Sequence, residues 1–353
     1  MNNQIDRLLA KRVSFLADAG PDEDIAISSR IRLARNLADH RFPVSADAEE
    51  LHEICNAVSS AAADSGALGC PECFSFDPEK LDELDREFLL ERRLASRDFL
   101  NRQTGTRLLV KSDESCSVMI NEEDHLRVQT MLPGFQLDAV WKQIDELDSQ
   151  LGSRLNYAFD DRLGFLTSCP TNVGTGMRAS VMLHLPGLVL AGQIAPTIQG
   201  INKLNLAVRG IDGEGTANQG SLFQISNQST LGESEPQILE RLNAVIGQLI
   251  VHEKNARRLL LQRDQFSLLD HVGRSYGTLR HSYKLTGEEA LNCLSGVRVG
   301  VDLGMFTSLD IHTVNELFIG IGAAHLQKKE GRVLSSLERD ICRAALCREK
   351  LKI

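Results

Sequence analysis

Alternation between apolar and polar residues is the feature that most constrains how this chain folds. Residues 24–36 read DIAISSRIRLARN. The apolar residues of this segment share one parity: Ile25, Ile27, Ile31 and Leu33. The polar residues share the other: Ser28, Arg30 and Arg32. Because successive side chains of a β-strand point to opposite faces, the segment predicts a strand with one apolar face and one basic face.

Three further segments have the same period. Residues 117–131 predict a hairpin with a short acidic link, and its parity places Glu123, His125 and Arg127 on one side. Residues 206–215, LAVRGIDGEG, predict a strand that runs into a glycine-broken loop. Residues 176–185, GMRASVMLHL, alternate so that one face carries Arg178, Ser180, Met182 and His184.

Four of these predicted strands present arginines: Arg30, Arg32, Arg127, Arg178 and Arg209. Such a group of guanidinium ions would repel itself unless a polyanion lay among its members. A nucleoside triphosphate is the simplest candidate, because guanidinium pairs bidentately with phosphate oxygens and keeps its charge at physiological pH. The sequence contains no G-x-x-x-x-G-K-[ST], H-R-D or D-F-G motif, so neither a P-loop nor a eukaryotic-type kinase site is expected.

The motifs resemble, in order, those of the phosphagen (guanidino) kinases. They are SSRIR at 28–32, NEEDHLR at 121–127, CPTNVGT at 169–175, RASV at 178–181 and RGxxGE at 209–214. The resemblance implies an α/β fold with a central antiparallel sheet flanked by helices, and ATP with Mg²⁺ as cofactors. It implies these nucleotide-binding residues: Ser28, Ser29, Arg30, Ile31, Arg32, Arg127, Arg178, Ala179, Ser180, Val181, Met182, Arg209, Gly210, Ile211, Asp212, Gly213 and Glu214.

The three adjacent acids of NEEDHLR have a chemical use in such an enzyme. A protonated guanidinium is a poor nucleophile, so a carboxylate must orient it and accept a proton as nitrogen attacks the γ-phosphate. The resemblance makes Glu123 that base and Glu214 a second clamping carboxylate. Glu122 and Asp124 would help to hold Mg²⁺ through water. Cys169 would lie beside the substrate guanidinium; the alternative is a buried thiol in a turn.

The positions of the motifs along the chain indicate which branch of this family the sequence resembles. Kinases of small guanidino compounds have a helical domain before these motifs, whereas here residues 1–27 precede Ser28 and residues 258–353 follow the shared region. That arrangement is similar to the bacterial protein arginine kinases of the McsB type, as are RSYGTL at 274–279, GVDLG at 300–304 and RDICRA at 339–344. With little chain available for a lid, we expect an open site that admits an arginine of a polypeptide.

One position departs from that pattern. McsB-like sequences often read E-K-H-L where this chain reads Glu91-Arg92-Arg93-Leu94. Arg93 therefore replaces a histidine that lies near the nucleotide, and we do not include Arg93 among the expected site residues.

We expect a catalytic domain at residues 1–257 and a helical domain at 258–353 that dimerises. A helix-spaced stripe precedes the boundary: Ile238, Leu239, Leu242, Ile246, Leu249 and Ile250. The last helix has a predicted apolar side of Leu337, Ile341, Ala344 and Ala345, with Arg339 and Arg343 opposite. Resemblance implies that RDxxRA binds phosphoarginine through Arg339, Asp340, Arg343 and Ala344. The alternative is a solvated helix face.

Composition excludes several classes of protein. The chain is 42% hydrophobic and 25% charged, as in ordinary globular proteins, and has no apolar run long enough for a membrane span or signal peptide, so we expect a cytoplasmic protein. A net charge of -9 argues against a nucleic-acid-binding coat. Eight cysteines are too few for a disulfide scaffold, and Cys70 and Cys73 lack further zinc ligands, so we expect reduced thiols.

The leading prediction is ATP-dependent phosphorylation of protein arginine. Resemblance further implies that the mark directs proteins to a Clp-type protease and inactivates a stress repressor, and that a zinc-binding activator takes part. Two alternatives remain open at this stage: a kinase for free arginine or another small guanidino compound, and a non-catalytic phosphoarginine-binding adaptor.

Overall fold

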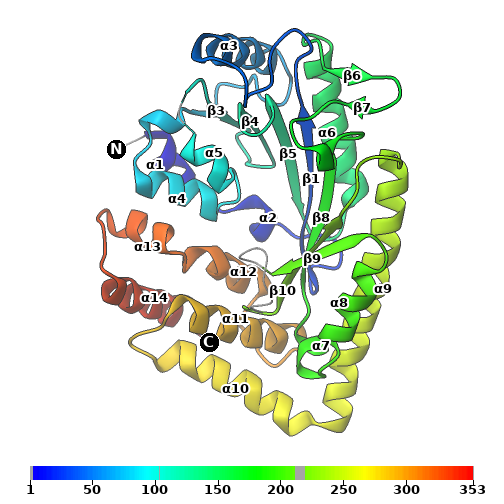
Figure 1. Ribbon diagram of the computed structural model, residues 1–353. Helices are drawn as coiled ribbons and strands as arrows, with labels where there is room; N and C mark the ends of the chain where they lie inside the picture. The colour runs from blue at the N-terminus through cyan, green and yellow to red at the C-terminus, as the bar shows by residue number, and fades with distance from the viewer. Residues whose placement is uncertain (1–2, 103, 211–218, 353) are drawn as a thin grey trace.

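A central antiparallel sheet organises the protein, for which a computed structural model describes residues 3–102, 104–210 and 219–352 (Figure 1). The sheet has eight strands in the order β2-β3-β4-β5-β1-β8-β10-β9. Their bounds are β1 Ala26–Arg35, β2 Phe74–Phe76, β3 Arg107–Val110, β4 Cys116–Ile120, β5 Leu126–Pro133, β8 Met177–His184, β9 Leu206–Gly210 and β10 Leu222–Asn227. A separate ribbon pairs β6 (Phe159–Asp160) with β7 (Gly164–Phe165). The predicted fold class is confirmed.

Helices flank this sheet and continue as a helical layer at the C-terminal end of the chain (Figure 1). The α-helices are α1 Asn3–Leu9, α2 Ser14–Ala17, α3 Ala48–Ala63, α4 Glu83–Glu91, α5 Arg97–Asn101, α6 Leu137–Gly152, α7 Pro186–Leu190, α8 Ile194–Asn202, α9 Glu235–Arg263, α10 Gln265–His281, α11 Gly287–Asp302, α12 Ile311–Gly320, α13 Ala323–Glu330 and α14 Ser336–Lys350. Two 3-10 turns are η1 Pro78–Lys80 and η2 Pro170–Asn172.

Strand β1 lies in the middle of the sheet, with β5 on one side and β8 on the other. Ile31 and Leu33 are fully buried in the main core, where α3, α6 and α9 pack on the sheet, as the alternation predicts. Ile27 does not follow that prediction. A β-bulge between Ala26 and Ser28 shifts the register, and Ile27 packs instead with Met131 on the opposite face.

The predicted hairpin of β4 and β5 is confirmed, and its link turns sharply at Asn121, whose φ is 61°. The Asn121 side chain stabilises this turn by donating to the carbonyls of Leu51 (2.8 Å) and Gly105 (2.7 Å). The predicted common side of Glu123, His125 and Arg127 is wrong for His125. Its ring is fully buried and Nδ1 accepts from the Leu37 amide at 2.9 Å.

Helix α9 continues through the predicted domain boundary at residue 257 and ends at Arg263. It begins with a capping box at Ser234 and Gln237, and all six residues of the predicted apolar stripe are buried. Helices α10 to α14 then form a separate hydrophobic core of their own.

The predicted faces of α14 are wrong. Arg343 is buried together with Ala344, whereas Leu337, Ile341 and Ala345 are exposed. The reason lies in hydrogen bonds that the helix period cannot reveal. The Arg343 guanidinium donates to the carbonyls of Ile321 (3.0 Å) and Leu285 (2.8 Å), and to Asp340 at 2.6 Å. An inward arginine satisfied in this way displaces the apolar side chains to the surface.

The prediction of reduced thiols is wrong for Cys70 and Cys73, which form a disulfide. A turn closed by the Cys73 amide on the Cys70 carbonyl brings their Cα atoms within 5.4 Å, a separation that suits a disulfide. Within the described residues, no group of three or more His, Cys, Asp or Glu side chains is arranged to hold a metal ion.

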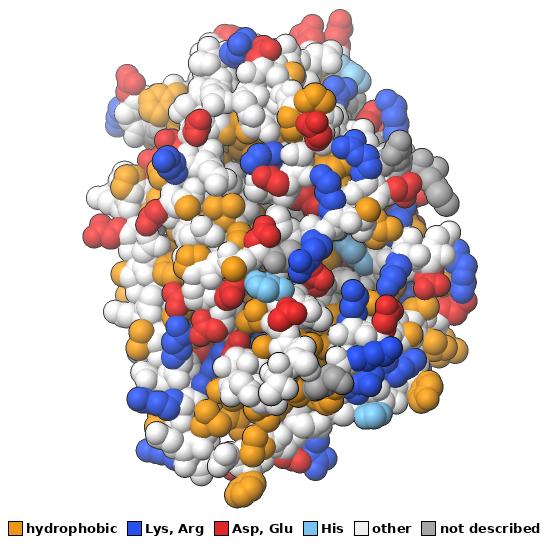
Figure 2. Space-filling model, turned by 180° about the vertical axis from the view of Figure 1, so that it is seen from behind, with side chains coloured by type: hydrophobic (Ala, Val, Ile, Leu, Met, Phe, Trp, Pro, Cys, Tyr) orange, Lys and Arg blue, Asp and Glu red, His pale blue; other side chains and the backbone are white. Residues whose placement is uncertain are grey.

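Charges of both signs are interspersed over the face seen in Figure 2, with no continuous basic surface there. Among the described helices, none is both long and apolar enough to span a bilayer.

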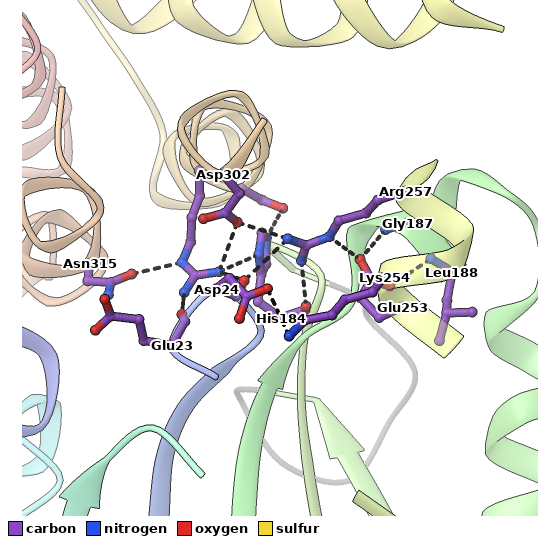
Figure 3. A network of polar contacts seen from close by, with 12 residues as sticks. Glu23, Asp24, His184, Gly187, Leu188, Glu253, Lys254, Arg257, Asp302 and Asn315 are labelled. Carbon is purple, nitrogen blue, oxygen red and sulfur yellow. Dashed lines mark hydrogen bonds and ion pairs between the residues drawn. The ribbon is translucent and has the colours of Figure 1, made fainter. Parts of the chain in front are cut away.

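A buried polar network joins the sheet to the helical layer (Figure 3). Arg298 of α11 is fully buried and donates to the carbonyls of Glu23 and Asp24, to Asn315 Oδ1 at 2.8 Å, and to His184 Nδ1 at 2.9 Å. Because Nδ1 accepts, Nε2 of His184 carries the proton that bonds Ser295 at 2.8 Å. Burial lowers the pKa of His184, so the ring is neutral.

Arg257 of α9 is the second cation of this network. It donates to Glu253 at 2.7 Å, to Asp302 at 2.9 Å and to the His184 carbonyl at 3.2 Å. Glu253 in turn accepts from the amides of Gly187 (2.7 Å) and Leu188 (2.9 Å) at the start of α7. Two arginines and two carboxylates therefore balance one another at the end of β8, with backbone groups satisfying the remaining donors and acceptors.

We expect Arg298→Ala to lower the free energy of unfolding by about 3–5 kcal/mol, because it leaves the carbonyls and Asn315 buried without a donor. Denaturant unfolding followed by circular dichroism measures the change. The matched control is Arg274→Ala, also in the helical layer, since Arg274 is 79% exposed and forms an ion pair with Asp270 on its own helix. The control should leave the free energy of unfolding close to that of the parent, because exposed ion pairs contribute little to stability. Equal losses in the two variants would contradict a structural role for the network.

Candidate active site

The register of the sheet brings the five arginines onto one face. Arg32 of β1 lies directly opposite Arg178 of β8, and Ala34 lies opposite Arg127 of β5. Arg30, two residues before Arg32, shares its face, and its Nη2 donates to Gln224 Oε1 at 2.9 Å. Gln224 is the direct partner of Arg209 on β9. Side chains that pair across antiparallel strands project from the same face, so all five guanidinium groups lie on it.

The same register turns the side chains of part of the predicted nucleotide-binding set away from the arginine face. Four of its residues have the opposite parity: Ser29, Ile31, Ala179 and Val181. The three apolar ones are fully buried in the main core, and the Ser29 hydroxyl donates to the Gly134 carbonyl at 2.8 Å. These side chains support the strand from behind and cannot contact a ligand on the arginine face.

Two cavities open on the arginine face. We define cavity A by Ser28, Arg30, Arg93, Ser180 and Gln224 at its polar end, together with a long apolar wall. We define cavity B by the following residues: Arg32, Glu122, Glu123, Asp124, Arg127, Cys169, Thr171, Asn172, Gly176 and Arg178. Arg30 lines cavity A and Arg32 lines cavity B, so neighbouring arginines of β1 connect the two.

Arg93, which the sequence analysis did not include among the expected site residues, lies beside Arg30 in cavity A. It follows α4, has a φ of 61° and lines cavity A with Arg30. Its charge is among the causes that lower the pKa of Arg30, after burial itself. The available signal was the departure from E-K-H-L, which puts Arg93 where such sequences have a histidine near the nucleotide.

The three adjacent carboxylates have different partners. Glu122 is buried, pairs with Arg127 at 2.5 Å and accepts from the Ser96 hydroxyl. Asp124 is also buried, and one of its oxygens accepts from Asn36 at 2.6 Å and from the Ser168 amide at 2.7 Å. Glu122 therefore fixes an arginine.

Asp124 fixes the loop that precedes Cys169. Glu123 is half-buried and lines cavity B, so it is the member of the trio placed to meet a ligand.

Glu123 and Cys169 meet in cavity B. Both side chains line this cavity, and the Cys169 thiol is the weakest of the influences that lower the pKa of Glu123. The thiol lies 3.0 Å from the Thr171 hydroxyl. Burial raises the pKa of Glu123, the charges of Asp124 and Glu122 raise it further, and Arg127 opposes them. A carboxylate with a raised pKa is a better proton acceptor than an ordinary one.

Gly176 brings this loop close to β1. Its φ is +62°, and a Cβ there would lie 2.6 Å from the Ala34 carbonyl oxygen. Only glycine fits such a close backbone approach without strain.

The electrostatics of the arginine face favour an anionic ligand. Burial, together with the charges of Arg93, Arg127 and Arg178, lowers the pKa of Arg30 to about 9. The pKa of Arg32 is also lowered, chiefly by burial and then by Arg30. Within the described part of the chain, the buried Nε of Arg32 has no hydrogen-bond partner. Phosphate oxygens placed between these groups would satisfy that donor and relieve the repulsion.

Two groups of predicted site residues do not line cavity A or cavity B within the described part of the chain. Gly210 ends β9, and Ile211, Asp212, Gly213 and Glu214 lie outside the described residues. On α14, Arg343 is held by backbone carbonyls and by Asp340, Ala344 is buried, and Arg339 is half-buried. This second group lies in the helical layer, outside the lining of cavities A and B.

Comparison with known proteins identifies the family. The ATP:guanido phosphotransferase C-terminal catalytic domain matches residues 53–256, and the protein-arginine kinase McsB C-terminal domain matches residues 265–353. The protein-arginine kinase of Halothermothrix orenii is 44% identical over 347 residues, covering 98% of this chain and 99% of that protein. The chain belongs to the protein-arginine kinase family.

Other similarities agree with this membership. The protein-arginine kinase of Geobacillus sp. (strain WCH70) is 46% identical over 343 residues, or 96% of this chain and 94% of that protein. Among solved structures, lombricine kinase superposes with a TM-score of 0.58 at 25% identity, covering 69% of this chain and 71% of that one. The substrate-free duplicated taurocyamine kinase from Schistosoma mansoni also superposes with a TM-score of 0.58, covering 79% of this chain and 41% of that one. Protein-arginine kinases thus share the guanidino-kinase sheet.

We expect Glu123→Gln to lower turnover at least ~10²-fold while ATP still binds, because the amide keeps the size of the side chain but cannot accept the proton. The ionised carboxylate is the active form, so activity should fall as the pH drops through its pKa. That acid limb of kcat/KM should lie above the ordinary value of 4.5 and vanish in the variant. Glu240→Gln, at an exposed position of α9, is the control. Near-normal turnover of Glu123→Gln would assign the base elsewhere.

Proposed function

We propose that this protein is an ATP-dependent protein-arginine kinase in which cavity A receives the nucleotide and cavity B receives the arginine side chain. One observation carries the proposal: four arginines of a single sheet face line the two cavities. Arg30 lies in cavity A, and Arg32, Arg127 and Arg178 lie in cavity B beside Glu123. The phosphate chain of ATP would follow these arginines. Its terminal phosphate would then meet the substrate nitrogen next to Glu123.

The chain's own groups can perform the transfer. Arg32, Arg127 and Arg178 would neutralise the charge on the γ-phosphate oxygens, the main contribution that protein groups make in phosphoryl transfer. Glu123 would orient the substrate guanidinium and take a proton from the attacking nitrogen. Cys169 would be a positioning group, since it lines the same cavity as Glu123 and its thiol lies 3.0 Å from the Thr171 hydroxyl. Glu214, which lies outside the described residues, would be the second carboxylate by family resemblance.

Mg²⁺ fits this arrangement as the companion of ATP. It binds oxygen ligands and keeps several waters, and it would supply further neutralisation of the phosphate charge. Glu122 and Asp124 would contact it through water. Both carboxylates already bond the chain, Glu122 to Arg127 and Asp124 to Asn36, so their first task is to hold the site in shape.

The second proposed site is on α14. Arg343 is fixed by two carbonyls and Asp340, so its guanidinium is pre-oriented, while the half-buried Arg339 lies one turn earlier on the helix. Two guanidiniums and one carboxylate suit both ends of phosphoarginine. The exposed apolar residues Leu337 and Ile341 adjoin this group and would make α14 part of a homodimer contact.

The cellular setting follows from family resemblance. We propose a cytoplasmic enzyme that marks proteins for a Clp-type protease, inactivates a stress repressor and works with a zinc-binding activator. Its acceptor is protein rather than a small guanidino compound, in agreement with the match of the helical region to the McsB C-terminal domain.

We expect incubation with ATP-Mg²⁺ and an unfolded arginine-rich protein to give acid-labile phosphate on arginine, read by mass spectrometry at neutral pH. Free arginine should give at least tenfold less product. Arg32→Ala should abolish transfer to protein, which excludes a contaminating kinase. Transfer to free arginine alone would overturn the assignment in favour of a small-guanidine kinase, and ATP-independent binding alone would favour an adaptor.

We expect Arg339→Ala to abolish phosphoarginine binding by calorimetry while the basal rate of transfer stays within about twofold, because α14 does not line either cavity. Arg332→Ala is the control, since Arg332 is an exposed arginine that pairs with Glu338 at the start of the same helix. Unchanged phosphoarginine affinity in Arg339→Ala would make RDxxRA a solvated helix face.

A further inference from the structure

Cavity A has two chemically different ends. Its polar end carries Ser28, Arg30 and Gln224, and the Arg30–Gln224 hydrogen bond crosses it at 2.9 Å. Arg93 and Ser180 also belong to the polar end, and Glu91 lines the cavity near Gly322. The remaining side chains of the wall are apolar. Phosphates need only the polar end, so the apolar end must serve another part of the ligand or serve packing alone.

The apolar wall is built by three separate parts of the chain. Helix α2 contributes Phe15 and Leu16, and the sheet contributes Ile27, Met131, Met182 and Leu222. The helical layer contributes Leu291 of α11 and Phe318 and Ile319 of α12. Most of the first two groups are buried in one hydrophobic cluster, against which Phe318 and Ile319 pack while remaining half-buried. The α12 side chains therefore have surface left to offer to a ligand.

We propose that Phe318 and Ile319, with Leu291, form the outer wall of the nucleoside pocket, so that the helical layer determines how the base of the nucleotide is bound. A nucleobase is a flat, largely apolar group that gains by packing on aromatic and aliphatic side chains. An apolar wall adjoining an arginine cluster matches the two halves of a nucleoside triphosphate. This inference rests on the proposed placement of the phosphates.

Hydrogen bonds from the catalytic part hold this wall on both sides. Glu91 of α4 accepts from the amides of Ala324 (2.9 Å) and His325 (2.9 Å), which fixes the start of α13. Gly322, directly before α13, lines cavity A and lies against the Glu91 carboxylate. On the other side, Asn292 accepts from the Gly220 amide at 2.8 Å.

Figure 1 shows α12 lying beside α2 at the end of the sheet, which agrees with the close packing of these two helices. A wall anchored at both edges is pre-organised for a ligand.

The alternative is a gap left where two layers pack imperfectly. The two interpretations differ in which ligand loses binding affinity when a side chain of the wall is truncated. If the wall holds the base, ATP should lose affinity and inorganic tripolyphosphate, which has no base, should not. If the wall serves packing alone, truncating it should either disturb the arginine face and lower the affinity for both ligands, or change neither affinity.

The test uses the full chain and compares ATP with inorganic tripolyphosphate by calorimetry. Phe318→Ala should raise the Kd and the KM for ATP roughly tenfold, the effect of losing one buried aromatic contact. Its Kd for tripolyphosphate and its kcat at saturating ATP should stay within about twofold of the parent. Ile319→Ala should raise the ATP values about threefold, and Phe318→Leu should restore part of the loss.

The matched control is Phe266→Ala on α10, a phenylalanine that is 84% exposed, which should change neither Kd. If Phe318→Ala fails to fold, the test uses Phe318→Leu and Ile319→Ala instead. For each of these variants the change in Kd for ATP is compared with the change in Kd for tripolyphosphate. Equal weakening of both ligands, or unchanged ATP affinity, would overturn the inference. If the parent does not bind tripolyphosphate, the proposed phosphate site is wrong, and the comparison of ATP binding between Phe318→Ala and Phe266→Ala still decides whether α12 contacts the nucleoside.

Discussion

The concentration of like charge on one face of the sheet is the constraint on which the rest of the structure depends. Guanidinium groups on neighbouring strands raise the energy of one another, as the lowered pKa of Arg30 records. The protein tolerates this because β1 is held by strands on both sides and its other face is buried in the main core. The electrostatic cost is thereby offset by packing on the reverse of the same strand, and the unrelieved charge remains available for an anion.

The acidic link shows how the chain limits this repulsion without cancelling it. Glu122 neutralises Arg127, and Asp124 accepts backbone and amide donors instead of meeting an arginine. A third carboxylate paired in the same way would leave cavity B without an unpaired acid for a ligand. Glu123 instead lines cavity B and has a raised pKa, chiefly because it is partly buried, so three adjacent acids have three different surroundings.

The helical layer is joined to the sheet mainly by polar groups whose partners are backbone atoms. Arg298 reaches the carbonyls before β1, and Glu91 receives the amides at the start of α13. Such contacts fix direction more strictly than apolar packing does, because a hydrogen bond weakens steeply with angle. One corner of this layer, residues 321–324, contacts Arg343 of α14 through the Ile321 carbonyl and borders cavity A through Gly322. Any influence of α14 on the nucleotide would have to pass through contacts of this kind.

The sequence by itself determined the strands β1, β4, β5, β8 and β9, the stripe of α9 and the family, because periods of 2 and 3.6 residues and contiguous motifs are local properties of a chain. It also predicted that the five arginines share a site with Glu123, and the register of the sheet puts the arginines on one face. Only the tertiary structure decided the rest. The bulge that turns Ile27, the inward Arg343 and the disulfide of Cys70 with Cys73 depend on partners or turns that periodicity does not report. Cavity A takes its wall from residues as distant as Phe15 and Phe318, and no local pattern can show that two such side chains meet.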